Sequence, residues 1–120
     1  MQFVRGGLEK LPLKDASVDA AVSVLVLPYV ERPREAVAEM RRILRPDAGG
    51  GGVALIVDMV EHGREEYRTT MGHQRLGFPV EEMSRMLRGA GFEQVRVQIL
   101  PPEAGARGPG LFAGIGRVKA

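Results

Sequence analysis

The sequence contains no cysteine, and aromatic residues make up only 5% of its 120 residues. The absence of cysteine excludes a disulfide scaffold, a cysteine-ligated zinc site, an iron–sulfur cluster and thiol catalysis. The longest apolar run, residues 20–30, is interrupted by Ser23 and Pro28 and is too short to span a bilayer. The chain opens without a basic stretch followed by an apolar one, so we expect no secretory signal and a cytoplasmic location.

The charges are nearly balanced and widely spread. Seventeen basic and 15 acidic residues give a net charge of +2, and most arginines stand close to a glutamate in the sequence. Nucleic-acid binding needs a concentrated basic face with stacking aromatic residues, and no such block is present. Apolar residues at 44% and charged residues at 27% are ordinary for a folded domain, and the length predicts a single domain over residues 1–120.

The order of apolar runs predicts an α/β fold. The run from Val18 to Leu27 is rich in β-branched residues and almost continuously apolar, which is typical of a strand buried on both faces in a parallel sheet. A helix between Pro33 and Pro46 and a second apolar strand complete a right-handed parallel crossover. The predicted strands are 3–5 (a short stub), 18–27, 53–57, 92–100 and 111–118, the last two forming a hairpin; the predicted helices are 34–44, 64–71 and 79–90.

Three segments then resemble one family in the same order along the chain. Residues 7–13 (GLEKLPL), followed by Asp15 and residues 17–19 (SVD), resemble the stretch after the third strand of class I S-adenosylmethionine-dependent methyltransferases. Residues 39–46 (EMRRILRP) resemble the helix before the fifth strand of that family, and residues 90–92 (AGF) resemble the turn into the sixth. The resemblance covers nearly the whole chain.

A fourth segment narrows the resemblance to a subgroup. Residues 71–78 (MGHQRLGF), which follow Asp58 and Met59, are similar to quinone C-methyltransferase relatives that are often fused to arsenic-repressor-type DNA-binding domains. The glycine-rich turn and the first two strands of the family have no counterpart in the sequence. The resemblance therefore implies the C-terminal portion of a methyltransferase, a truncated Rossmann-like sheet of strand order 4-5-7-6 with the stub as strand 3.

The resemblance also implies where a site would lie. The cofactor, S-adenosylmethionine, would contact Gly7, Leu8, Glu9, Ser23, Val24 and Leu25. The acceptor side would be formed by Tyr29 and His73 as catalytic residues, together with Asp58 and Phe78. Structural alternatives remain for three of these residues: a packed tyrosine at Tyr29, a histidine at His73 that fixes a lid, and a capping carboxylate at Asp58. Glycines in the first turn let a backbone approach such a cofactor closely, so we expect weak or absent binding by this chain alone.

Other candidate sites are weaker. His62 and His73 stand eleven residues apart without a third ligand at helical spacing, so no metal site is predicted. The glycines at 49–52 enter a strand rather than a helix and lack a following Lys-Ser/Thr, which argues against a phosphate loop. The repeat Gly114-Ile115-Gly116 is interpreted as twist or close packing within a strand.

Two functional hypotheses follow. The chain is either the substrate-side part of a methyltransferase that acts on a small acceptor once the missing strands are supplied, or a non-catalytic oligomerisation or protein-interaction remnant. Without strand 1, the strand Ala20 to Leu27 would be an apolar sheet edge, and such edges pair with other chains. We therefore expect a homodimer or a complementing chain at this edge, with neither nucleic acid nor membrane as a partner.

Overall fold

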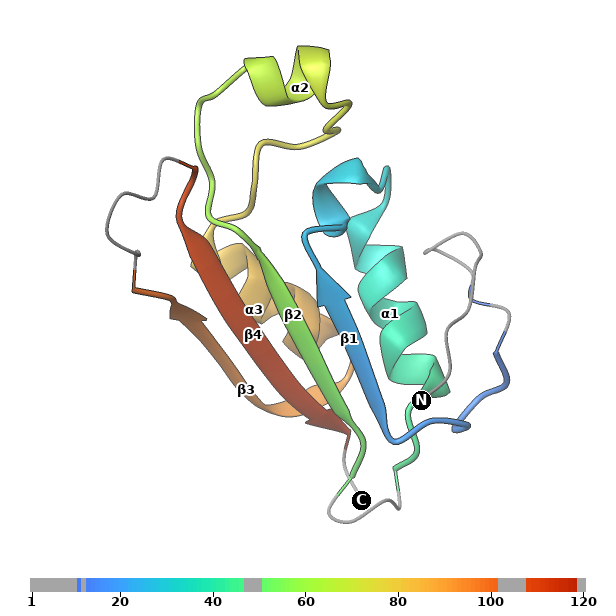
Figure 1. Ribbon diagram of the computed structural model, residues 1–120. Coiled ribbons are helices and arrows are strands. Elements are labelled where there is room, and N and C mark those ends of the chain that lie inside the picture. Colours follow the sequence, from blue (N-terminus) through green and yellow to red (C-terminus); the bar gives the residue numbers. More distant parts are fainter. Residues whose placement is uncertain (1–10, 12, 47–50, 102–107, 119–120) are drawn as a thin grey trace.

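The computed structural model describes residues 11, 13–46, 51–101 and 108–118, and the structural statements below concern these residues. The elements in chain order are β1 (Ala20–Val24), the 3-10 helix η1 (Leu27–Tyr29), α1 (Pro33–Ile43), β2 (Val53–Met59), α2 (Glu66–Thr70), α3 (Val80–Gly89), β3 (Phe92–Ile99) and β4 (Leu111–Val118) (Figure 1). The predicted stub at 3–5 lies outside the described residues.

The four described strands form one sheet in the order β1-β2-β4-β3. β1 runs parallel to β2, with Ala20 opposite Val53 and Val24 opposite Val57. β4 is antiparallel to both β2 and β3. The α/β class and the predicted order 4-5-7-6 are confirmed for these strands. The parallel pair joined by α1 and the antiparallel hairpin at the other end match the two connections that the sequence predicted.

The core lies between the sheet and two helices on one of its faces. α1 begins at Pro33, whose fixed φ suits the first helical turn, and buries Ala36, Val37, Met40 and Ile43. α3 buries Met83, Met86 and Leu87 with a similar apolar stripe. The sheet contributes alternate residues, Ala54 and Ile56 from β2 and Phe112 and Val118 from β4. Both helices begin and end within one residue of the predicted bounds.

β1 differs from the expected strand. The prediction that residues 18–27 form a strand buried on both faces is wrong: the strand has five residues, and Val22 and Val24 are 64% and 51% exposed. Leu25 ends it with a φ of +56°, and the next turn is η1. In the described part of the chain β1 pairs with β2 alone. The burial on both faces that the apolar pattern predicts is therefore absent, while the position of β1 at an edge of the described sheet agrees with the expectation of an apolar sheet edge.

Two glycines in β4 leave space on this strand for side chains of α3 and for the side chain of the first residue of β3. A Cβ on Gly116 would lie 2.9 Å from Phe92 Cβ, and one on Gly114 would lie 3.4 Å from Leu87 Cδ1. The interpretation of this repeat as close packing is confirmed.

Between β2 and α3 the chain forms a segment that extends away from the sheet and then returns to the end of β2. Residues 60–78, called the lobe below, begin and end at a parallel bridge between Val60 and Phe78. Phe78 N donates to Met59 O at 3.0 Å, and Glu61 N donates to Phe78 O at 3.1 Å, which closes the base. α2 lies in the lobe, beyond the carboxyl ends of β1 and β2 (Figure 1), and is shorter than the predicted helix 64–71.

Candidate functional site

The carboxyl ends of the parallel strands β1 and β2 meet the lobe and η1. In open α/β sheets, ligands bind beyond the carboxyl ends of the strands. η1 follows β1 directly and Asp58 lies one residue before the end of β2, so the connections after both strands place side chains at this edge. Four of the predicted residues, Tyr29, Asp58, His73 and Phe78, come from these segments.

Asp58 is fully buried and joins β2 to η1. Its Oδ2 accepts a hydrogen bond from Leu27 N at 3.2 Å, and its Oδ1 accepts one from Met59 N at 2.9 Å. Burial raises the pKa of the carboxyl group, and the two backbone hydrogen bonds oppose that shift. Asp58 thus accepts from the first residue of η1 and from its own neighbour in β2, and not from the segment after β2 that the capping alternative named. A contact between Asp58 and an acceptor stays a prediction.

His73 is buried, with 3% of its surface exposed, and contacts two tyrosines edge to face. Its ring centroid lies 4.5 Å from that of Tyr29 and 5.4 Å from that of Tyr67. The backbone N of His73 donates to Tyr67 O at 3.1 Å. Nδ1 of His73 is buried and has no hydrogen-bond partner among the described residues, and burial lowers the pKa of the imidazole.

His62 extends the row of rings from the other side of Tyr67. The His62 and Tyr67 centroids are 4.9 Å apart, again edge to face. Nδ1 of His62 accepts a hydrogen bond from Arg64 N at 3.2 Å, so in the neutral ring the proton lies on Nε2, which is buried without a described partner. We call Tyr29, His73, Tyr67 and His62, in this order, the ring column.

The ring column contains every histidine and every tyrosine of the chain, since the sequence has two of each. Sequence reasoning identified Tyr29 and His73 and missed Tyr67 and the place of His62. The sequence held one signal for Tyr67. Aromatic residues make up only 5% of the chain, yet both tyrosines lie within a few dozen residues of both histidines.

Phe78 lies in the core below the lobe. It is fully buried, and the guanidinium carbon of Arg75 lies 4.4 Å from its ring centroid. Arg75 binds the carboxylate of Glu82 through two hydrogen bonds of 2.6 and 2.7 Å, which lower the pKa of Glu82. This arrangement fixes the base of the lobe to α3. The acceptor-side role of Phe78 stays a prediction.

The predicted cofactor-side residues are only partly described, since Gly7, Leu8 and Glu9 lie outside the described residues. The other three, Ser23, Val24 and Leu25, do not converge. Ser23 and Val24 point to opposite faces of the sheet, as successive strand residues do, and Leu25 is 39% exposed. Ser23 Oγ is buried and has no hydrogen-bond partner among the described residues.

Ser23 lines a cavity of about 240 Å³ between β1 and α1. The other lining residues are apolar: Leu11, Leu13, Val18, Ala20, Ala21, Val22, Leu27, Ala36, Met40 and Ile43. S-adenosylmethionine carries an amino group, a carboxylate, ribose hydroxyls and a sulfonium, and these need several polar partners. One hydroxyl in an apolar cavity does not supply them, so the described residues do not fit a complete site for this cofactor.

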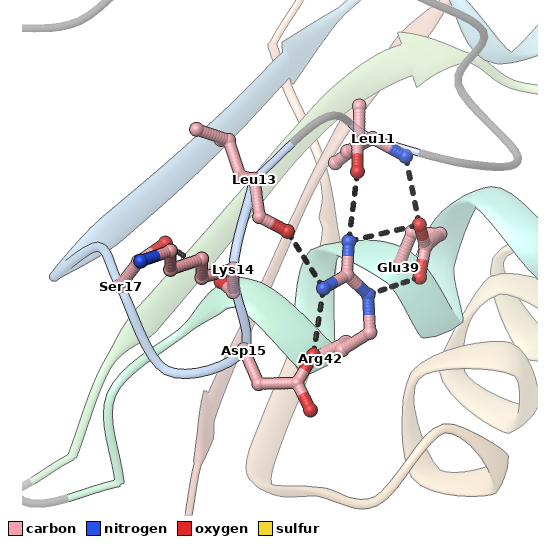
Figure 2. A network of polar contacts seen from close by, with 7 residues as sticks. All are labelled: Leu11, Leu13, Lys14, Asp15, Ser17, Glu39 and Arg42. Carbon is pink, nitrogen blue, oxygen red and sulfur yellow. Dashed lines mark hydrogen bonds and ion pairs between the residues drawn. The ribbon is translucent and has the colours of Figure 1, made fainter.

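Arg42 holds the segment that leads into β1 (Figure 2). Its guanidinium donates to Leu11 O at 2.9 Å, to Leu13 O at 2.7 Å and to Asp15 Oδ1 at 2.7 Å. Its Nε also binds Glu39 Oε2 at 2.5 Å, and Glu39 Oε1 accepts from Leu11 N at 2.7 Å. We call this network the Arg42 clamp. It fastens the segment that follows residues 7–9 to α1, and sequence reasoning did not find it.

No group of three or more histidine, aspartate or glutamate side chains in the described ranges could hold a metal ion. No helix within those ranges is both long and apolar enough to cross a membrane.

The sheet order, the two helices on one face and the site beyond the carboxyl strand ends define a Rossmann-like α/β protein. A family model described as "Methyltransferase domain" matches residues 1–67, more than half of the chain. The chain belongs to this methyltransferase domain family.

Solved methyltransferase structures share the fold. A possible histamine N-methyltransferase from Thermotoga maritima is 28% identical with a TM-score of 0.72, over 95% of this chain and 62% of that one. A methyltransferase from Haloferax volcanii, solved in complex with the activator Trm112, is 18% identical with a TM-score of 0.75, over 96% and 60%. The chain thus spans about three fifths of the length of these two proteins.

One curated protein also matches. An uncharacterized 37.1 kDa protein from a Streptomyces fradiae transposon is 49% identical over 41 residues, which are 34% of this chain and 12% of that protein. It is similar to this chain over a short segment.

Proposed function

We propose that this chain forms the acceptor-side part of an S-adenosylmethionine-dependent methyltransferase and methylates a small molecule once a cofactor-side segment is supplied. The observation that carries the proposal is the membership of the methyltransferase domain family. The fold supports it, since this chain aligns with about three fifths of the length of two solved methyltransferase structures. Methyl transfer depends largely on holding two reactants in position. Tyr29 and His73 are the proposed catalytic residues, with Asp58 and Phe78 supporting the acceptor side.

The chain by itself is proposed to bind the cofactor weakly or not at all. Micromolar affinity needs about 8 kcal/mol of binding free energy. Of the described cofactor-side residues, Ser23 offers one hydroxyl, and Val24 and Leu25 offer apolar side chains. The backbone of Gly7, Leu8 and Glu9 stays a predicted contact, and these groups together leave most polar atoms of the cofactor without a partner.

The missing cofactor contacts are proposed to come from a second polypeptide that pairs with the β1 edge, and without such a polypeptide the same edge is proposed to pair with a second copy of this chain. Val22 and Val24 are exposed there, and β1 has one described neighbour in the sheet. An apolar strand with an unpaired edge favours pairing with another strand. The Haloferax relative was solved with an activator protein, so a methyltransferase with this fold can assemble with a partner.

A calorimetric titration of the 120-residue chain with S-adenosylhomocysteine tests the cofactor proposal. We expect no heat of binding and no rise of the melting temperature at millimolar ligand, because only a ligand that binds the folded state stabilises it. Micromolar affinity of the chain alone would overturn this proposal. Light scattering in the same buffer tests the assembly, for which we expect a mass above that of one chain.

The alternative function is a non-catalytic oligomerisation or protein-interaction module. The same exposed edge of β1 favours it. A dimer that stays unable to bind S-adenosylhomocysteine when it is mixed with a polypeptide carrying the two missing strands and the glycine-rich turn would favour this module. Restored binding would favour the enzyme. The quinone-methyltransferase subgroup, the fusion to a DNA-binding domain and a cytoplasmic location stay predictions.

A further inference from the structure

The lobe is attached to the rest of the protein at two places. Its base is closed by the bridge between Val60 and Phe78. Its far part rests on η1, where Pro28 O accepts hydrogen bonds from Gln74 N at 2.6 Å and from Arg75 N at 3.3 Å. α2 buries none of its residues. The ring column is therefore the main side-chain contact that joins α2 to η1.

Protonation of His73 conflicts with its surroundings. An imidazolium carries a proton on both ring nitrogens, whereas a neutral imidazole carries one. Nδ1 of His73 is buried without a described partner, so in the charged ring its N–H would point at no acceptor. Leaving a buried donor unsatisfied is unfavourable, and leaving a buried charge without a counter-ion is more so.

Protonation of His62 conflicts with a hydrogen bond that is already formed. Nδ1 of His62 accepts the N–H of Arg64 in the neutral ring. A proton on Nδ1 would turn this acceptor into a donor that faces another donor. The two rings also carry the same charge once protonated, and the presence of His73 lowers the pKa of His62. Both imidazoles are thus compatible with the closed lobe only in their neutral form.

The charged groups around the ring column do little to compensate. Burial lowers the pKa of both histidines; Arg64 lowers that of His62 further, and Glu66 opposes the shift. Two other arginines near the column are already paired, Arg68 with Glu65 and Arg75 with Glu82. The charged and titratable groups of η1, of the end of β2 and of the lobe, besides the two histidines, are Tyr29, Asp58, Glu61, Arg64, Glu65, Glu66, Tyr67, Arg68 and Arg75, and α3 adds Glu82, which binds Arg75.

Acidification destabilises the closed lobe through its two histidines. A histidine whose pKa in the closed lobe lies below its ordinary value of 6.5 stabilises the closed form above pH 6.5, and that stability is lost as the pH falls below it. Asp58 acts in the opposite direction, because its pKa is raised above 3.8 and its burial is more favourable when it is protonated. An opening on acidification therefore cannot come from Asp58.

From this geometry we propose that the lobe is a pH-sensitive lid over the carboxyl ends of β1 and β2, closed while His62 and His73 are neutral and opened when they take up protons. The inference goes beyond the proposed function, since it is a property of this chain that requires neither methyl donor nor acceptor. In mildly acidic surroundings the open lid would expose the buried residues of η1 and Asp58 near the end of β2, and would uncover further the side chain of Tyr29, which is 48% exposed in the closed form.

Hydrogen exchange of the 120-residue chain between pH 5 and pH 8, corrected for the intrinsic exchange rates, tests the lid. The amides of His62, His73 and Gln74 are hydrogen-bonded within the lobe or to η1, so they report its closure. We expect their protection to fall several-fold from pH 7.5 to pH 5, while the amides of β2 and β4 keep theirs. Unchanged protection of the lobe across this range would overturn the proposal.

A double variant, His62→Phe with His73→Phe, keeps ring edges at both positions and removes both titrating groups. Its lobe is expected to be equally protected at both pH values, and a loss as large as that of the unmodified chain would contradict the mechanism. A proton NMR titration of the two imidazoles in the unmodified chain needs no variant. The proposal requires that the pKa values of both imidazoles lie below 6.5 and coincide with the pH midpoint of lobe opening. Values of 6.5 or higher would contradict it.

Discussion

Arg42 and Glu39 lie on the same face of α1, and the Nε of the arginine is 2.5 Å from Oε2 of the glutamate. The other carboxylate oxygen of Glu39 accepts the N–H of Leu11, while the guanidinium donates to the carbonyl oxygen of the same residue. The pair therefore binds both polar backbone groups of Leu11. Because Leu11 is the second residue after Glu9, the clamp fixes the segment that leads away from the predicted cofactor loop.

Replacing Arg42 by alanine should release this segment. Arg42→Ala is expected to lower the melting temperature by several degrees and to speed proteolytic cleavage within residues 11–17, since carbonyl oxygens and a carboxylate lose their donor together. Arg42→Lys should resemble the alanine variant, because an ammonium group cannot reproduce the planar set of donors. Arg45→Ala is the control: its ion pair with Asp19 spans 3.5 Å between exposed side chains, and its loss should shift the melting temperature by less than about 2 °C. Equal effects at both positions would contradict the clamp.

The buried carboxylate of Asp58 should give the protein a measurable dependence on pH. Since burial raises its pKa, the stability that it contributes is present below that raised pKa and decreases as the pH rises through it. Asp58→Asn should remove this decrease. The free energy of unfolding of the variant should also be lower by about 1–3 kcal/mol. The reason is that the amide side chain accepts with its one oxygen and presents its NH₂ group to the second backbone N–H. Urea unfolding at several pH values measures both effects, and an Asp58→Asn protein with the original pH dependence would show that another group titrates.

Gly77 and Gly72 provide a test variant and a matched control for the packing at the base of the lobe. Their φ angles are +78° and +75°, so alanine is disfavoured to a similar degree at both, by about 1–2 kcal/mol. A Cβ at Gly72 meets no atom within 4 Å, whereas a Cβ at Gly77 would overlap the carbonyl group of Val60. Gly77→Ala should therefore cost roughly 2 kcal/mol more than Gly72→Ala in urea unfolding. Equal costs would mean that the base of the lobe can shift without penalty.

A charge on the exposed face of β1 should change assembly without unfolding the chain. Val22 is 64% exposed, so Val22→Lys should leave the free energy of unfolding nearly unchanged while lysine discourages pairing at this strand. Ile99, which is 60% exposed on β3 at the other end of the described sheet, provides the control Ile99→Lys. Light scattering is expected to give a monomer mass for Val22→Lys and a larger mass for Ile99→Lys. The reverse pattern would place the interface at β3.

The helices could be predicted because their signals are local, whereas the strand order was predicted from the resemblance to the methyltransferase family. Pro33 and the spacing of Val37 and Met40 define α1 without knowledge of its surroundings. The same period-based reasoning failed at β1, because an apolar side chain in a strand indicates that a face can be covered and does not show what covers it. Val22 fits a buried strand in composition and is largely exposed in the described structure.

The candidate site was harder to predict than the fold. Asp58 lies near the end of a strand, where open α/β sheets place functional groups, and this rule indicated it, whereas Tyr29 was indicated by the family resemblance. The contacts of His73 with Tyr29 and Tyr67 join segments separated by several dozen residues through a lobe that has no regular period. Sequence spacing carries no information about such contacts. The clamp at Arg42 depends in the same way on backbone carbonyl groups, which every residue possesses.

The absent side chains of Gly114 and Gly116 have a consequence for relatives of this protein. Phe92 occupies the space that a Cβ on Gly116 would take, and Leu87 closely approaches the corresponding space at Gly114. A homologue with alanine at the position of Gly116 would have to shift the side chain at position 92 or carry a smaller one there, whereas alanine at the position of Gly114 would make an ordinary contact with residue 87. The residue at position 116 should therefore vary together with the residue at position 92 across related sequences.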